Sequence, residues 1–289
     1  MMKTILLNML CTKIPTHSNS MGLYSGIGKP FYSTKDCEIY NIDCLHGLVN
    51  MREQVFNLTV TSPPYNIGKA YESVLPLDDY LDWCEKWLAE VYRLTKNNGS
   101  FWLNLGYLSI KSVAKAVPIS YLIWDRIPFF LIQEVVWNYG AGVAGRKFYS
   151  PRNEKFLWYV KNEQNYVFNL DEVRDPDVKY PNQKKNGKIK VNPLGKNPTD
   201  VWSFKKVTSG RNRSSKERTS HPAQFPERVI ERIIKASSNK NDLVFDPFIG
   251  SGTTAVVAIN LGRKVIGFEI NEDYCQIAAD RIDNMLVVG

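Results

Sequence analysis

Two segments far apart in the chain carry residue types that could bind a ligand or act on one. Segment 62–65 reads SPPY and directly follows 58–61, a short run that is typical of a strand. Its two consecutive prolines end the strand, because neither has an N–H to donate to a neighbouring strand. Segment 246–255 reads DPFIGSGTTA and lies between a predicted strand at 243–245 and a predicted helix at 253–261. Its glycines let a ligand approach the backbone, and the unpaired N–H groups at a helix start attract an anion.

The glycine-rich loop predicts a cofactor that contains a ribose. Gly250, Gly252 and Ala255 fit the dinucleotide-binding fingerprint. Glu269 ends the strand that follows the helix, where an acid accepts hydrogen bonds from ribose hydroxyls. Taken alone, the loop supports NAD and S-adenosylmethionine about equally. A tight glycine turn, with Glu269 merely exposed at a strand end, is the structural alternative.

The elements that must position these segments alternate between strand and helix, which predicts a parallel sheet. Ligands of an open α/β sheet bind at the carboxyl ends of its strands, beside the point where the strand order reverses. The strands that end at Ser62 and Asp246 should therefore flank one crevice. The predicted strands lie at 39–42, 58–61, 100–105, 131–137, 156–160, 243–245 and 264–270. The predicted helices lie at 78–95 with Asp78 as N-cap, at 111–127 with an interruption at Pro118, after Pro226, and at 253–261 before Gly262.

Positive charge is concentrated in one stretch of the chain. The formal net charge is +8. The stretch from Lys179 to Arg218 contains twelve Lys or Arg residues and only two acidic residues, Asp200 and Glu217. Interleaved Gly, Pro and Asn exclude a long helix there. A solvated face is the plain alternative. Nucleic-acid phosphates are the favoured partner, because a clustered basic stripe is their electrostatic signature.

Composition excludes several classes of protein. The 289 residues are 44% hydrophobic and 12% aromatic, which argues against a disordered chain. No apolar run approaches the roughly 18 residues of a membrane span. The cysteines are odd in number and form no C-x-x-C pair, so we expect neither a zinc site nor a disulfide framework, and a reducing compartment. They are Cys11, Cys37, Cys44, Cys84 and Cys275. Residues 1–30 are expected to be a flexible leader, with Met21 as the true start.

The two segments and their order resemble the amino-methyltransferases of DNA. A catalytic SPPY first, a basic variable region next and the cofactor loop near the C-terminus are similar to the β group of that family, the bacterial restriction-modification and orphan methylases. The resemblance covers roughly residues 37–282. The residues that it assigns to catalysis are Ser62, Pro63, Pro64 and Tyr65. Those that it assigns to the cofactor are Asp43, Cys44, His221, Phe225, Asp246, Pro247, Phe248, Gly250, Ser251, Gly252, Thr253, Thr254, Glu269 and Ile270.

The resemblance implies transfer of a methyl group from S-adenosylmethionine to an exocyclic amine of a base turned out of the DNA duplex. The Ser62 hydroxyl and the Pro63 carbonyl would accept the two amine hydrogens, and Ser62 would donate to cytosine N3. Tyr65 would stack on the base, with an ordinary core aromatic as the alternative. Methylation at carbon 5 is disfavoured, because no cysteine here follows a proline. SPPY is typical of cytosine-N4 members, and adenine N6 remains the alternative.

We therefore predict an α/β, Rossmann-like S-adenosylmethionine-dependent methyltransferase fold: a mostly parallel twisted sheet with helices on both faces, plus a basic loop-rich target-recognition insertion. Its parts are a leader (1–30), a catalytic half (31–161), the insertion (162–219) and a cofactor-binding half (220–289). The loops 66–73 and 141–146 are expected to close over DNA or cofactor.

The predicted partners are double-stranded DNA, a cognate restriction endonuclease as genetic partner, and a second copy of the chain. No metal and no membrane are expected, and the predicted location is a bacterial or archaeal cytoplasm. Two rival classes remain, a catalytically silent DNA-binding protein and a nicotinamide-dependent oxidoreductase.

Overall fold

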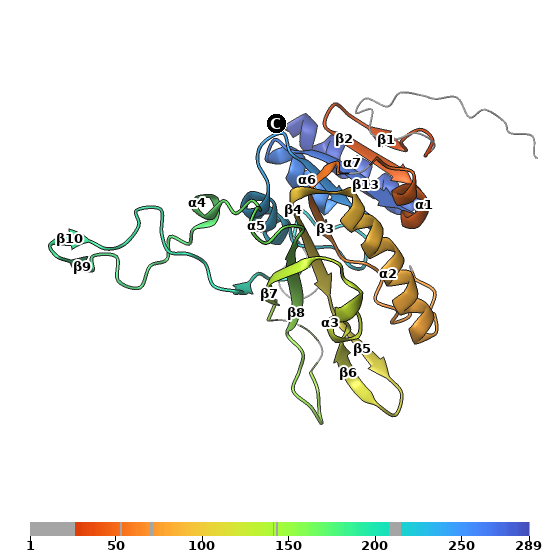
Figure 1. Ribbon diagram of the computed structural model, residues 1–289, viewed down its shortest axis with the longest axis horizontal. Coiled ribbons are helices and arrows are strands. Elements are labelled where there is room, and N and C mark those ends of the chain that lie inside the picture. Colours follow the sequence, from red (N-terminus) through yellow and green to blue (C-terminus); the bar gives the residue numbers. More distant parts are fainter. Residues whose placement is uncertain are drawn as a thin grey trace, which may run out of the picture.

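A mixed sheet forms the centre of the molecule (Figure 1). The computed structural model describes residues 27–52, 54–69, 72–140, 142, 144–207 and 215–288. Most of the expected leader, Met21 included, lies outside the described residues. Within them, nine strands run in the order β1-β2-β13-β12-β3-β4-β8-β7-β11. The bounds are β1 Tyr32–Ser33, β2 Cys37–Asn41, β13 Lys264–Glu269, β12 Leu243–Asp246, β3 Phe56–Thr61, β4 Thr95–Leu105, β8 Asn153–Val160, β7 Phe130–Asn138 and β11 Val201–Ser203.

The five strands from β2 to β4 are parallel, which confirms the predicted sheet type. Beyond β4, β8 runs antiparallel to both β4 and β7. The strand order reverses between β12 and β3, which pair directly with Leu58 opposite Val244. The chain continues from β3 to one side of this point and from β12 to the other. The two strands that were predicted to flank one crevice are therefore direct neighbours in the sheet.

Helices cover both faces of the sheet, as predicted (Figure 1). On one face, α2 (Leu77–Leu94) buries Trp87, Leu88 and Val91 against β-strand aromatics such as Phe101, with α1 (Cys44–Val49) beside it. On the other lie α5 (Glu227–Ser237), α6 (Thr253–Asn260) and α7 (Glu272–Val288). The strands contribute residues to two layers of core, one on each face, so the sheet is buried between its helices.

Two helix predictions were wrong. The helix expected at 111–127 is instead a hairpin of β5 (Tyr107–Ile110) and β6 (Ala114–Pro118), then α3 (Ile119–Leu122) and a 3-10 turn at Trp124–Arg126. Ser112 has φ 62° in the hairpin turn, and Pro118 cannot donate to a helix around it. Helix α2 begins at Leu77 with Pro76 as N-cap, so Asp78 lies in the first turn and not at the cap.

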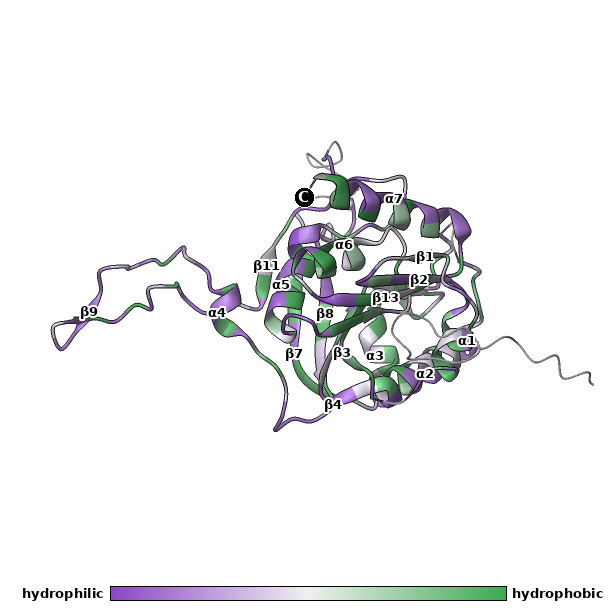
Figure 2. Cartoon of the chain, turned by 90° about the horizontal axis from the view of Figure 1, so that it is seen from above, coloured by the Kyte–Doolittle hydropathy of each residue, from purple (hydrophilic) through white to green (hydrophobic). Residues whose placement is uncertain are grey.

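A long arm leaves the body between α4 (Leu170–Val173) and β11 (Figure 1). It ends in a two-stranded ribbon of β9 (Lys184–Lys185) and β10 (Lys188–Ile189), and Figure 2 shows that it is largely hydrophilic. The tight turn is Asn186-Gly187, whose positive φ angles of 53° and 79° suit those residue types. The arm falls inside the predicted insertion 162–219, whereas β11 joins the edge of the main sheet.

In the part of the chain that the structure describes, no helix has the length and apolar character needed to cross a membrane.

Candidate active site

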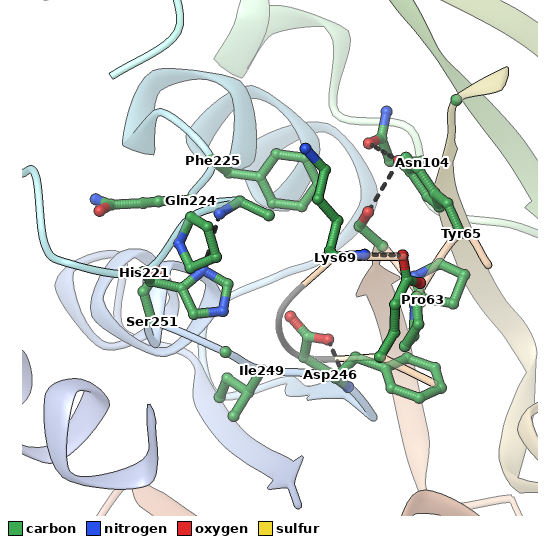
Figure 3. Close-up of a pocket in the computed structure, with 18 of the residues that line it drawn as sticks. Pro63, Tyr65, Lys69, Asn104, His221, Gln224, Phe225, Asp246, Ile249 and Ser251 are labelled. Atoms are coloured by element: carbon green, nitrogen blue, oxygen red, sulfur yellow. Dashed lines mark hydrogen bonds between the residues drawn. The ribbon is translucent and has the colours of Figure 1, made fainter. Parts of the chain in front are cut away.

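A cavity of about 650 Å³ opens at the carboxyl ends of β3, β12 and β4 (Figure 3). This volume suits a small organic ligand. Every residue that the sequence analysis assigned to catalysis or cofactor lines it, with the single exception of Gly252. The two segments that were 180 residues apart in the chain therefore meet at one cavity, although their chemical roles remain predictions.

Asp246 holds the two segments together. Its carboxylate accepts hydrogen bonds from the Thr61 hydroxyl at 2.6 Å and from the Thr254 hydroxyl at 2.7 Å. It also accepts from the Phe248 N–H at 3.1 Å. Burial raises the pKa of Asp246 to about 6, because the charged form loses its hydration. This side chain thus fixes the residue before Ser62 to the first turn of α6.

The turn at Ser62 is the start of a hydrogen-bond chain. The Ser62 hydroxyl donates to the Tyr65 hydroxyl at 3.0 Å, and Tyr65 donates to the Asn104 side-chain oxygen at 2.7 Å. The Asn104 amide then donates to the Lys155 carbonyl at 3.0 Å. The hydroxyl hydrogen of Ser62 is therefore directed at Tyr65, which differs from the expected donation to a base nitrogen.

Two neighbours fix the geometry of this turn. The Tyr80 hydroxyl donates to the Pro64 carbonyl at 2.9 Å. A Cβ on Gly106 would lie 2.8 Å from the Tyr65 ring, so only a glycine at position 106 leaves room for the ring. Asn104 was not among the predicted site residues, although a lone amide in the apolar strand FWLNL could have indicated it.

The glycine-rich loop curls over the end of β12. The Gly250 N–H donates to Glu269 at 3.0 Å, and the second oxygen of Glu269 accepts from the Asn271 N–H at 2.9 Å. Burial raises the pKa of Glu269 and lowers that of His221 to about 4. At neutral pH, His221 is therefore an uncharged ring beside the loop.

Gly252 has a packing role that the fingerprint did not predict. Its φ is 75°, and a Cβ at this position would lie 2.7 Å from the Cβ of Ala278 on α7. The glycine therefore permits close contact between the loop and the last helix. It is the one assigned residue that does not face the cavity.

A preformed loop borders the cavity after Tyr65. The Glu72 carboxylate accepts from the backbone N–H groups of Asn66 (2.8 Å), Ile67 (2.9 Å) and Lys69 (3.0 Å). The Asn66 side chain is bonded to both backbone groups of Leu75. This network keeps Lys69 at the cavity wall, where sequence reasoning had placed no cation.

Comparison with known proteins identifies the family. A family model described as DNA methylase matches residues 56–280. The chain is 62% identical over 257 residues to Type II methyltransferase M.ScaI of Streptomyces caespitosus, covering 89% of this chain and 84% of that protein. It is 38% identical to Type II methyltransferase M.BglII of Bacillus subtilis, covering 83% of this chain and 67% of that protein. The chain belongs to the DNA methylase family.

Solved structures agree with the fold of this methylase. The cytosine-N4-specific PvuII DNA methyltransferase superposes with a TM-score of 0.70 at 23% identity, covering 90% of this chain and 93% of that one. The M1.HpyAVI–SAM complex gives a TM-score of 0.57 at 25% identity, covering 86% and 99%. The methylase is thus an S-adenosylmethionine-dependent DNA methyltransferase of the N6/N4 family.

The residues around the cavity fit S-adenosylmethionine. The loop leaves a cradle at Gly250, where a Cβ would already lie 2.9 Å from His221. Glu269 and Asp43 place carboxylate groups at the cavity wall, where they would accept from hydroxyl or ammonium groups, and Asp43 also caps α1 through the His46 N–H at 3.1 Å. Aromatic rings such as Phe225 and Phe248 supply apolar surface.

The side of the cavity formed by β7 and β8 holds an ion pair that the sequence analysis did not assign. The Lys206 ammonium lies 2.6 Å from Glu154 and 3.9 Å from the centre of the Tyr139 ring. Both partners are largely buried and line the cavity. No local pattern links residues 52 positions apart, so only the folded chain brings them together.

Proposed function

We propose that this methylase transfers a methyl group to the exocyclic N4 amine of cytosine in double-stranded DNA, on a base turned out of the duplex. The observation that carries the proposal is the Thr61–Asp246 hydrogen bond of 2.6 Å. It holds the amine-accepting turn beside the glycine-rich loop, so one cavity contains both the acceptors for the amine and a cradle for the cofactor.

The chemistry explains why acceptors are needed. An exocyclic amine is a poor nucleophile, because its lone pair is delocalised into the ring. S-adenosylmethionine, when bound, supplies an electrophilic methyl group on a sulfonium. The Ser62 hydroxyl and the Pro63 carbonyl accept the two amine hydrogens and so favour a pyramidal nitrogen, which is a stabilisation realised in the transition state. No covalent intermediate with the chain is required.

The hydrogen-bond chain supports Ser62 as an acceptor. Because Ser62 donates to Tyr65 and Tyr65 donates to Asn104, the lone pairs of the Ser62 oxygen are left to accept, and one of them takes the amine hydrogen that the Pro63 carbonyl does not. Rotation about the C–O bond also lets the hydroxyl donate to cytosine N3 when a base displaces the Tyr65 contact. A serine at this position, with no carboxylate or amide, favours cytosine over adenine.

The remaining assignments concern the cofactor and the DNA. Glu269 accepts hydrogen bonds from the ribose, Asp43 and Cys44 contact the adenine, and the segment 221–225 contacts the methionine end. The basic insertion 162–219 contacts DNA through its lysines and arginines, as the positive charge of the exposed arm supports. The likeness to Type II methyltransferases supports a cognate endonuclease as genetic partner.

Nucleoside analysis of the product tests the proposal. The protein is incubated with duplex DNA and S-adenosylmethionine labelled in the methyl group, and the DNA is digested to nucleosides. Label in N4-methylcytosine is the expected result. Label in N6-methyladenine would overturn the choice of base but keep the activity. DNA binding without any label would instead indicate a silent DNA-binding protein.

A further inference from the structure

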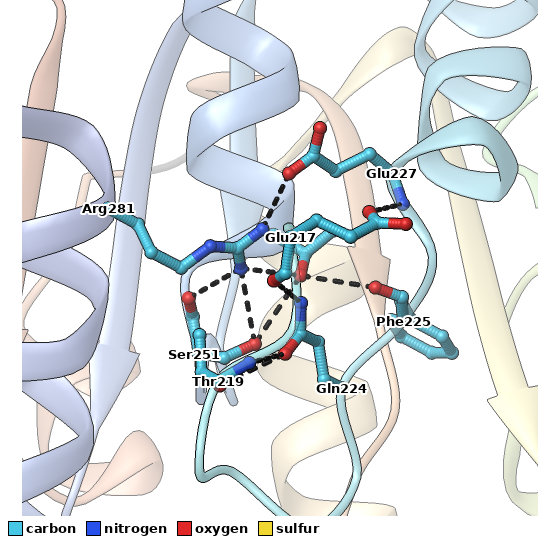
Figure 4. Close-up of polar contacts among 8 residues, drawn as sticks. Glu217, Thr219, Gln224, Phe225, Glu227, Ser251 and Arg281 are labelled. Carbon is cyan, nitrogen blue, oxygen red and sulfur yellow. Dashed lines mark hydrogen bonds and ion pairs between the residues drawn. The ribbon is translucent and has the colours of Figure 1, made fainter. Parts of the chain in front are cut away.

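A buried arginine on the last helix joins the cofactor loop to the end of the basic insertion (Figure 4). The Arg281 side chain is 12% exposed, and its guanidinium lies 2.7 Å from the Glu227 carboxylate. It also donates to the Ser251 carbonyl at 2.8 Å and to the Thr253 hydroxyl at 2.9 Å. Ser251 and Thr253 both line the cavity.

The position of this cation is unfavourable by itself. It lies beside the start of α6, where the helix dipole favours anions, and burial lowers the pKa of Arg281. The Glu227 carboxylate compensates for part of that penalty. Helix α6 has Gly252 at its N-cap and no side-chain cap, and the hydrogen bonds from Arg281 hold Ser251 and Thr253, the residues on either side of Gly252.

The network continues into the segment that follows the basic stretch. The Glu227 N–H donates to the Glu217 carboxylate at 2.9 Å. The Gln224 side chain donates to the Glu217 carbonyl and accepts from Thr219 at 2.8 Å. Glu217 lies between Lys216 and Arg218, two exposed basic residues. A phosphate that binds these two residues would hold Glu217, and with it the Glu227–Arg281 pair.

We propose that Arg281 is a positioning residue that couples DNA binding to cofactor binding. Both ligands favour the same arrangement: DNA phosphates order the 215–219 segment, and the cofactor requires the loop that Arg281 holds. Each ligand then raises the affinity for the other by the same factor, as linkage demands. The proposal rests on DNA methylase activity and on the cofactor loop, and not on which base is methylated.

Calorimetry with S-adenosylhomocysteine, the unreactive product, tests the coupling without turnover. Its Kd is measured with and without a duplex substrate that the native protein methylates. For the native protein we expect DNA to tighten the Kd at least about 5-fold. Arg281→Met should weaken the Kd without DNA about 10-fold or more, because it removes several charge-assisted hydrogen bonds, and should abolish the enhancement by DNA. Arg281→Lys should lose less than Arg281→Met in both quantities, the Kd without DNA and the enhancement by DNA.

Arg93→Met is the matched control. Arg93 also pairs with a carboxylate, Glu90 at 2.6 Å, and donates to the backbone carbonyls of Met51 and Leu48, but none of these partners lines the cavity, whereas Ser251 and Thr253 do. Arg93→Met should lower the melting temperature. The Kd for S-adenosylhomocysteine, with and without DNA, should stay within about 2-fold of the native value. If Arg281→Met behaves like Arg93→Met, Arg281 is only structural and the proposal is overturned.

Glu217→Ala keeps the proposal testable if Arg281→Met does not fold. It removes the link between the basic segment and Glu227 without touching the loop, so the enhancement by DNA should fall towards one. An enhancement equal to that of the native protein would contradict the coupling route. A native protein whose Kd for S-adenosylhomocysteine does not change when DNA is added would overturn the coupling itself.

Discussion

At the scale of single residues, a hydrogen-bond chain fixes the direction in which the Ser62 hydroxyl donates. Ser62, Tyr65 and Asn104 each donate to the next member, and the chain ends on the Lys155 carbonyl. The direction of donation leaves the lone pairs of the Ser62 oxygen available as acceptors, next to the glycine-rich loop. Tyr65 therefore has two separable parts, a hydroxyl that orders this chain and a ring that borders the cavity.

Two substitutions at Tyr65 separate these parts. Tyr65→Ala removes the proposed stacking surface, which is worth ~1–3 kcal/mol, and should lower kcat by about 5- to 150-fold. Tyr65→Phe keeps the ring and should lower kcat less. Both should leave the cofactor Kd within about 2-fold of the native value. Steady-state kinetics and calorimetry check this, and a loss of thermal stability with unchanged turnover per folded molecule would instead identify Tyr65 as a packing residue.

At the scale of elements, the site exists because β3 and β12 are neighbours at the point where the strand order reverses. Main-chain pairing brings their ends together, and Asp246 then links β3 to α6 through two threonine hydroxyls. The link requires a buried carboxylate, which is costly to desolvate even when it is hydrogen-bonded. The stability of this junction should therefore depend on pH.

The sign of that dependence follows from the raised pKa of Asp246. Its pKa is 3.8 in an unfolded chain and about 6 in the fold, so the folded protein binds the proton more tightly. The contribution of Asp246 to the free energy of unfolding is fully present below pH 3.8 and is lost as the pH rises through about 6. Urea unfolding of the native protein and of Asp246→Asn between pH 4 and 8 measures it.

The difference in unfolding free energy, native minus variant, should fall by at most about 3 kcal/mol between pH 4 and 6 and stay constant above. His221 has a lowered pKa of about 4 and so gives the opposite slope, but both proteins contain it and it cancels in the difference. A difference that rises with pH, or that does not change, would contradict the raised pKa.

At the scale of the whole molecule, the arm extends away from the body (Figures 1 and 2) and carries positive charge. All four lysines of its ribbon region are exposed, namely Lys184, Lys185, Lys188 and Lys190. A two-stranded ribbon is narrow enough to enter the major groove of DNA. Because the arm carries little core of its own, it can be altered without disturbing the sheet.

Replacing these four lysines with glutamine should weaken DNA binding with a definite salt signature. Each lost phosphate contact lowers the slope of log K against log salt by about 0.9, so the slope should fall by up to roughly 3 to 4. The cofactor Kd should not change. Glutamine at four exposed lysines elsewhere, Lys29, Lys35, Lys86 and Lys240, is the control. An unchanged slope in the arm variant would show that the arm does not contact phosphates.

Local patterns in the sequence were enough for most of the strands and for the position of the site. Consecutive prolines end a strand, and closely spaced glycines permit a tight turn. Both signals lie within a few residues of the chain, so the 62–65 turn and the 246–255 loop were predictable. The hairpin at 107–118 was not, because its apolar residues fit a helix as well as paired strands. Helix α7 was missed because its buried face is built from small residues such as Cys275, Ala278 and Ala279, which give a weak periodic signal.

The sequence alone thus determined the family, the α/β architecture and the two segments that form the cavity, since each depends on residue types close together in the chain. Only the tertiary structure decided how the side chains work together: Asp246 with Thr61, Tyr65 with Asn104, Glu154 with Lys206, and Arg281 with the loop. These pairs are distant in the chain and meet only when parallel strands and packed helices bring them together. A hydrogen bond between distant residues leaves no periodic trace in one sequence, and so it can be recognised only in the fold.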